Sequence, residues 1–187
     1  MSKSLFFSVL TFVFVVVVAC NSNDPAVIYS DWIKQNTAYF NNMKDSAGFV
    51  NYVIPNSGGL SYYYKILKPG NPDSISPIPA SVVKVNYCGK LINGKTFDST
   101  YSGNSPLNNS TASPLVFSLQ GTIVGWELNL IQMKPGEIRT VVLPMELCYG
   151  PYPMGSILPY STLRFDIQLI SFENSSGLIL GQLHKKN

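Results

Sequence analysis

Charged side chains are scarce in this sequence of 187 residues, because Asp, Glu, Lys and Arg together make up only 12% of it. The 13 basic residues exceed the 10 acidic ones by three, and they are scattered along the chain. A surface that binds DNA or RNA needs a dense basic patch. The sequence therefore predicts no nucleic-acid partner. Its 45% of hydrophobic residues favours a folded chain over a disordered one.

Histidine and cysteine are also rare. The one histidine is His184, and Cys20, Cys88 and Cys148 form neither a C-x-x-C pair nor a spacing typical of metal ligands. A zinc site or a Cys/His nucleophile is hard to build from this set, so we expect no metal and no other cofactor. Cys88 and Cys148 are interpreted as separate small side chains in a β-sheet rather than as a disulfide.

Long apolar runs are missing except for residues 5–18, which follow Lys3. Fourteen residues are too few for a transmembrane helix, which needs roughly 20, and suit a signal peptide. The run ends in Val17-Val18-Ala19-Cys20, which resembles the bacterial lipobox. The thiolate of Cys20 can be alkylated by a diacylglycerol donor.

We therefore predict a lipoprotein signal peptide over residues 1–19, lipid attachment at Cys20 and a polar tether over residues 20–27. This interpretation places the protein in the cell envelope of a bacterium, lipid-anchored to a membrane and facing outside the cytoplasm. A plain signal peptide, or a short anchor helix that contains a cysteine, is the alternative.

Apolar residues repeat with a helical period over residues 28–43, at Ile28, Trp32, Tyr39 and Met43 among others. This pattern predicts a helical N-terminal extension over residues 28–59, which ends in the turn cluster Asn-Ser-Gly-Gly at residues 56–59.

The pattern changes to β from residue 60 onward. The expected strands are residues 60–68, 81–92, 115–119, 137–143 and 162–172. A short helix is expected over residues 125–133, a hairpin turn at Asn93-Gly94, and a surface insertion over residues 102–114. These elements predict an α+β fold over residues 60–173, in which a curved antiparallel β-sheet wraps around one short helix. The tail, residues 174–187, carries no clear pattern.

Four sequence blocks recur in a fixed order within this region. They read VKVNYCGKLINGKTFDST at 83–100, FSL with IVGWE at 117–127, MKPGE at 133–137, and PMELCYG with STLRFDI at 144–167. Together these blocks resemble the FKBP-type peptidyl-prolyl cis–trans isomerases.

The resemblance implies an isomerase that acts on X-Pro bonds of exported proteins during folding, with Pro-containing polypeptides as clients. A non-catalytic chaperone-like or scaffolding module on the same fold is the alternative, and a purely structural envelope lipoprotein is disfavoured by the number of matching blocks. The sequence does not indicate an oligomeric state.

The resemblance also implies the site. Trp126 would form the floor of a proline pocket whose walls are Tyr87, Phe97, Ile123 and Phe165. The Tyr149 hydroxyl and the Ile123 backbone N–H would each bind a substrate carbonyl, and Asp98 would lie near the Tyr87 hydroxyl. Leu115, which replaces an aromatic residue of many members, and Ile157, which would cover the site, complete the expected substrate contacts. On pattern alone, Trp126, Phe97 and Phe165 are core residues.

Overall fold

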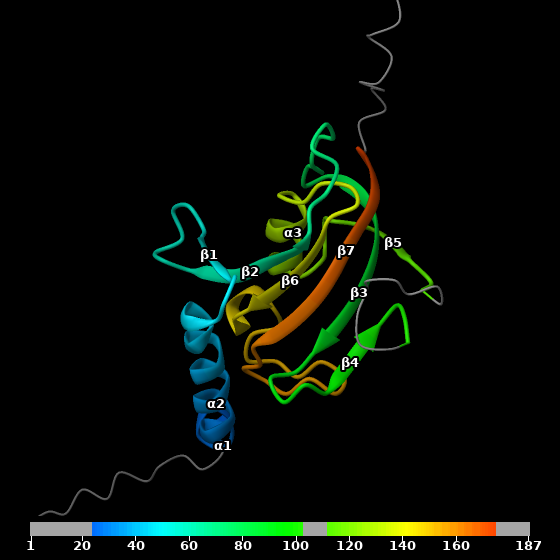
Figure 1. Cartoon of the computed structure of the whole chain (residues 1–187). Coiled ribbons are helices and arrows are strands. Elements are labelled where there is room, and N and C mark those ends of the chain that lie inside the picture. Colours follow the sequence, from blue (N-terminus) through cyan, green and yellow to red (C-terminus); the bar gives the residue numbers. More distant parts are fainter. Residues whose placement is uncertain (1–23, 103–111, 175–187) are drawn as a thin grey trace, which may run out of the picture.

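A computed structural model describes residues 24–102 and 112–174 of the chain (Figure 1). The predicted signal peptide, Cys20, most of the predicted insertion and the C-terminal tail lie outside these residues. In the described part, seven strands form one sheet in the order β1-β2-β6-β7-β3-β4, and β5 pairs with β3. All of these pairings are antiparallel.

The strands are β1 (Val50–Val53), β2 (Ser61–Lys68), β3 (Ser81–Lys90), β4 (Thr96–Ser99), β5 (Leu115–Ser118), β6 (Ile138–Leu143) and β7 (Leu163–Asn174). The helices are α1 (Pro25–Ile28), α2 (Ser30–Asn41) and α3 (Val124–Leu130), with 3₁₀ turns η1 (Asn42–Asp45) and η2 (Met145–Leu147). The predicted fold class is confirmed, and the five predicted strands and the short helix match observed elements within a few residues.

Two strands were not predicted. β4 follows the Asn93-Gly94 turn, where Gly94 has a φ of 82° that favours glycine. β1 lies in the region expected to be helical, and it pairs with β2 through Tyr52 and Tyr62. Three of its four residues are exposed, so it shows no alternation that a sequence pattern could reveal. The sheet therefore begins before residue 60, and residues 28–59 are only partly helical.

The sheet curves around α3, and the core fills the space between them (Figure 1). Leu163, Phe165, Ile167 and Leu169 of β7 are all at most 3% exposed, which confirms the predicted alternation of that strand. α3 approaches β6 closely at Gly125, where a Cβ atom would lie 2.5 Å from Cδ1 of Leu143. Glycine at this position therefore allows the close approach of α3 to the sheet.

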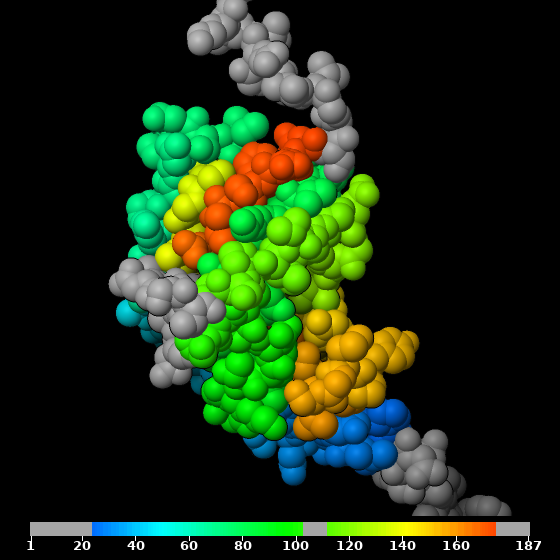
Figure 2. All heavy atoms as spheres, turned by 90° about the vertical axis from the view of Figure 1, so that its right-hand side faces the viewer, coloured from blue at the N-terminus to red at the C-terminus, as the bar shows by residue number. Residues whose placement is uncertain are grey.

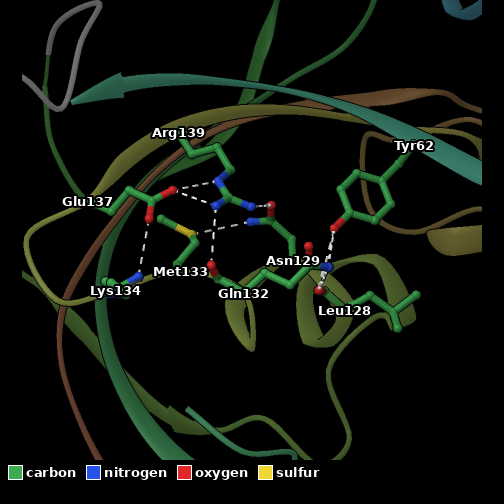
Figure 3. Close-up of polar contacts among 8 residues, drawn as sticks. All are labelled: Tyr62, Leu128, Asn129, Gln132, Met133, Lys134, Glu137 and Arg139. Carbon is green, nitrogen blue, oxygen red and sulfur yellow. Dashed lines mark hydrogen bonds and ion pairs between the residues drawn. The ribbon is translucent and has the colours of Figure 1, made fainter. Parts of the chain in front are cut away.

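A buried arginine ties the end of α3 to the sheet (Figure 3). The Arg139 side chain extends from β6, and its Nε donates a hydrogen bond of 2.7 Å to Oε1 of Glu137. Its Nη1 donates to Oδ1 of Asn129 over 3.1 Å, and its Nη2 donates to the carbonyl oxygen of Gln132 over 3.4 Å. Because the last carbonyls of a helix lack intrahelical donors, a cation at this end both satisfies and stabilises them.

Further contacts surround this arginine. The guanidinium lies 4.5 Å above the centre of the Tyr64 ring, a cation–π arrangement. On the other side of α3, Gln132 Nε2 donates to the Tyr62 hydroxyl over 2.8 Å (Figure 3). Arg139 and Glu137 are 4% and 5% exposed, so their charges are withdrawn from water and depend on each other. The network fixes α3 relative to both β2 and β6.

Cys88 is buried and Cys148 half-buried, and both are free thiols. Cys88 lies in β3 as predicted, whereas Cys148 lies just after η2 and not in the sheet. No helix within residues 24–102 and 112–174 is long and apolar enough to cross a membrane.

The buried ion pair gives a stability prediction. Arg139→Met keeps the apolar stem of the side chain but leaves the Glu137 carboxylate buried without its cation, which costs about 3–5 kcal/mol. We expect the free energy of unfolding, measured by denaturant titration, to fall by that amount. The double variant Glu137→Gln/Arg139→Met leaves no buried charge and should regain part of the loss. A double variant that is no more stable than Arg139→Met would contradict this interpretation of the network.

Candidate active site

A cavity of about 390 Å³ opens beside α3, between β3, β4 and β5. All seven residues predicted to form the catalytic pocket line it, and so does Leu115. Blocks that lie up to 78 positions apart in the sequence, from Tyr87 to Phe165, are therefore brought to one place. The geometry agrees with the set of residues that the resemblance implied, while their roles stay a prediction.

Trp126 forms the floor of this cavity and is fixed by other rings. It is 6% exposed, and the rings of Tyr87 and Phe165 meet it edge to face, with centroid distances of 4.9 and 5.3 Å and interplanar angles of 85° in both cases. Phe97 in turn meets Phe165 at 5.7 Å and 90°. Such contacts contribute about 0.5–1.5 kcal/mol each beyond the area they bury, so the aromatic walls are preorganised.

A glycine in β3 makes room for one of these walls. A Cβ atom at Gly89 would lie 2.5 Å from Cζ of Phe97 and 3.0 Å from Cε1 of Phe165. The backbone of β3 therefore runs directly behind the two rings. This close approach explains why glycine stands in the middle of a long strand, where it usually weakens pairing.

Two polar side chains of the cavity, Tyr87 and Asp98, are paired with each other. The Tyr87 hydroxyl donates a hydrogen bond to Oδ2 of Asp98, as predicted. The pairing of β3 with β4, which places Asp98 opposite Gly89, brings the two side chains together. Burial raises the pKa of Tyr87, and the hydrogen bond to the Asp98 carboxylate raises that pKa further.

Two groups near the mouth remain available to a ligand. Burial raises the pKa of Tyr149, and the neighbouring Cys148 and Asp98 add to the effect, so its phenol stays neutral. The Tyr149 hydroxyl makes no hydrogen bond to the described residues. Ile123 is the N-cap residue of α3, with an extended backbone (φ −61°, ψ 143°), and its carbonyl accepts from the N–H of Trp126. Neither the Tyr149 hydroxyl nor the Ile123 N–H is used by the fold in the part of the chain described.

Two further residues complete the description of the site. Ile157, predicted to cover it, is 4% exposed and belongs to the hydrophobic core together with Trp126 and Phe165, and its contact with a substrate stays a prediction. Its backbone closes a tight turn with Met154 through two hydrogen bonds. Phe117, which was not named as a site residue, lines the cavity, and its ring centroid lies 5.5 Å from that of Trp126. The period of two along β5 places Phe117 on the same face as Leu115, so the sequence carried the signal.

Comparison with known proteins identifies the family of the chain. The sequence profile of the family described as FKBP-type peptidyl-prolyl cis-trans isomerase matches residues 74–170, which is more than half of the chain. The chain therefore belongs to the FKBP-type peptidyl-prolyl cis–trans isomerase family.

Two curated relatives illustrate the relationship. The chain is 37% identical over 107 residues to the FKBP-type isomerase FkpA of Escherichia coli K12, an alignment that covers 57% of this chain and 36% of FkpA. It is 39% identical over 109 residues to the isomerase Mip of Coxiella burnetii, covering 58% and 43% of the two chains. The matched segment therefore spans less than half of these relatives.

Solved structures extend the likeness to most of the described fold. The crystal structure of E. coli FkpA superposes with a TM-score of 0.66 at 30% identity and covers 80% of this chain and 63% of that one. A peptidyl-prolyl isomerase from Pseudomonas syringae pv. tomato gives a TM-score of 0.64 at 26% identity, with 78% and 96% covered.

The buried phenols give a prediction for alkaline pH. Burial is the largest cause that raises the pKa of Tyr62, Tyr87 and Tyr101 above the ordinary value of about 10. The unfolded chain then loses these protons first, so their contribution to stability is complete below about pH 10 and is lost as the pH rises beyond it. Denaturant titrations across this range should show the decline.

Substitution assigns this effect to individual residues. Tyr87→Phe should make the decline less steep, and Tyr152→Phe, at a phenol that is 71% exposed, should leave it unchanged. Equal slopes for Tyr87→Phe and the unmodified chain would show that Tyr87 does not titrate as described.

Proposed function

We propose that this protein catalyses cis–trans isomerisation of X-Pro bonds in exported proteins during folding. The observation that carries the proposal is the cavity over Trp126, whose walls are rings held edge to face and where the described fold leaves the Tyr149 hydroxyl and the Ile123 N–H unused. A cavity of this kind suits the ring of a proline residue and the amide bond next to it. Membership of the isomerase family supports the same reaction.

The reaction needs a particular environment rather than a reactive group. Rotation about the prolyl amide has a barrier of roughly 18–20 kcal/mol, because the C–N bond is partly double. The twisted amide has lost that resonance, so it is less polar than the planar form. An apolar, water-poor cavity therefore binds the twisted amide better than the planar one, and this difference lowers the barrier.

The polar groups would orient the substrate. The Tyr149 hydroxyl and the Ile123 N–H would each donate a hydrogen bond to a substrate carbonyl. Asp98, which accepts from Tyr87, holds that phenol in place against Trp126. Leu115 and Phe117 line the side of the cavity formed by β5, where they favour an apolar residue before the proline.

A protease-coupled assay on a short X-Pro peptide tests the proposal, with the chain that lacks its first 20 residues. An acceleration of about 10³ to 10⁶ would require about 4–8 kcal/mol of differential stabilisation. We expect faster exchange than in buffer and a preference for an apolar residue X. If the folded protein did not accelerate the exchange above its rate in buffer, the proposed isomerase activity would be excluded.

One observation favours the non-catalytic alternative, a module that binds Pro-containing segments. Leu115, where many family members carry an aromatic residue, lines the cavity and is 45% exposed to water. A site open to water gains less from desolvation. Binding of a proline peptide without any acceleration would support this alternative.

Substitutions of Tyr149 and of Trp126 should differ in how they affect the rate and the stability. Tyr149→Phe removes one hydroxyl without a partner in the described fold, so stability should not change. The rate should fall by at most about tenfold, because a neutral hydrogen bond contributes about 0.5–1.5 kcal/mol. Trp126→Ala removes the floor, and truncation of a large packed aromatic costs about 3–5 kcal/mol, here shared between stability and catalysis.

Kinetics and thermal melts of both variants check this order of effects. If Tyr149→Phe abolished the activity while Trp126→Ala retained it, the description of the pocket would be wrong.

The proposal includes the location of the protein. The sequence Val17-Val18-Ala19-Cys20, followed at once by the polar residues Asn21-Ser22-Asn23, supports a lipoprotein of the bacterial cell envelope. The clients would then be Pro-containing polypeptides outside the cytoplasm.

Lipidation predicts that Cys20→Ser no longer takes up a fatty-acid label and is either released from the membrane fraction or left unprocessed. The unmodified protein, labelled in parallel, is the control. Equal labelling of the two proteins would reject Cys20 as the attachment point.

A further inference from the structure

The helix α2 buries a polar residue against the rest of the protein. Asn36 is the one buried residue within α2 and is 2% exposed. An amide removed from water is costly unless its hydrogen bonds are made, and here they are. Its Nδ2 donates to the Trp32 carbonyl over 2.8 Å, and its Oδ1 accepts from the backbone N–H of Thr162 over 2.8 Å.

Two more hydrogen bonds join the same partners. The Thr162 hydroxyl donates to the Asn36 carbonyl over 3.3 Å, and the Trp32 indole Nε1 donates to the Ser161 hydroxyl over 3.1 Å. The contact is thus made by two positions one helical turn apart on α2 and two consecutive residues just before β7. Its partners lie 126 and 129 positions apart in the sequence.

Ser161 and Thr162 end the loop of residues 150–162, which connects the pocket to β7. The stem of this loop is closed by the Tyr160 N–H, which donates to the Gly150 carbonyl over 2.8 Å. Tyr160 has a φ of 63°, an unfavourable value for a residue with a side chain, and its ring packs at 6.4 Å from Tyr29. Figure 2 shows this loop (orange) next to the N-terminal helices (blue).

Pocket residues lie directly beyond both ends of the loop. Tyr149 precedes Gly150, and Phe165 follows Thr162 by three residues along β7. The Gly150 N–H donates to the Met145 carbonyl over 3.0 Å, so the first end of the loop is also fixed to η2. Because Tyr149 is bonded directly to Gly150, a movement of the loop stem would also move Tyr149.

Apolar packing alone does not hold α2 in this position. A cavity of about 260 Å³ remains between α2 and the rest of the protein, with Ile33 and Phe40 on one side and Met145 and Tyr160 on the other. Loose packing leaves several positions of the helix similar in energy, whereas hydrogen bonds to Asn36 are directional and select one.

We propose that α2 positions the pocket of this protein: Asn36 fixes the stem of the 150–162 loop and, through that stem, the Tyr149 hydroxyl. Asn36 does not line the pocket cavity, so it acts as a positioning residue. The consequence for turnover depends on the proposed isomerase function, whereas the effect on the loop does not.

The test compares Asn36→Ala with Gln35→Ala, which removes an amide from the exposed face of the same helix. The loop offers a direct readout, because Met154 is 52% exposed and precedes Gly155, so chymotrypsin can cleave after it, whereas the Tyr152–Pro153 bond resists this protease. We expect Asn36→Ala to speed cleavage after Met154 and to raise KM for an X-Pro peptide, each about twofold to tenfold, with kcat nearly unchanged. Gln35→Ala should match the unmodified chain in both.

Two milder variants, the near-isosteric Thr162→Val and Trp32→Phe, which keeps an aromatic ring, make the proposal testable if Asn36→Ala unfolds. Trp32→Phe and Thr162→Val each remove one hydrogen bond of the contact and should change cleavage and KM in the same direction by smaller factors. Unchanged cleavage and unchanged KM in the folded variants would overturn the proposal. An unmodified chain with no isomerase activity would reject the proposed function, while the cleavage rates would still decide whether α2 fixes the loop.

Discussion

The position of α3 depends on one buried guanidinium. Arg139 joins β6 to the last turn of the helix, and the network around it extends to Tyr62 and Tyr64 of β2. α3 has only seven residues, so its own hydrogen bonds could not hold it as a helix in isolation. Near the start of α3, Gly125 packs directly on Leu143 and so determines how closely that end of the helix approaches the sheet. Trp126 is adjacent to Gly125, and these two constraints together decide where the floor of the pocket lies.

The pocket owes its properties to what surrounds it rather than to a reactive group. Edge-to-face contacts hold the rings, Gly89 lets the backbone pass behind them, and the Tyr87 hydroxyl is hydrogen-bonded to Asp98. Such a site suits a reaction in which a planar, polar amide becomes twisted and less polar. We infer a division of roles in which the fold supplies the environment and the two free donors orient the substrate. The helix α2 then holds the loop next to one of those donors.

Much of this arrangement could be predicted from the sequence. The alternation along β3 and β7 is strong because one face of each strand is buried, and the four ordered blocks identified the seven pocket residues. The features that the sequence did not predict are short elements or contacts between distant parts of the chain. β1 has an exposed pattern and exists because β2 pairs with it. Asn36 lies in an amphipathic helix, and the sequence gives no sign that its hydrogen-bond partner lies 126 residues away.

The central claim is that the pocket promotes rotation through its apolar environment and transfers no proton. The most direct test is the solvent isotope effect on kcat/KM for an X-Pro peptide, measured in H₂O and in D₂O at matched conditions. We expect equal values in the two solvents, because no bond to an exchangeable hydrogen is broken in the twisted state. A clearly slower reaction in D₂O would mean that proton transfer limits the rate, and would contradict this mechanism.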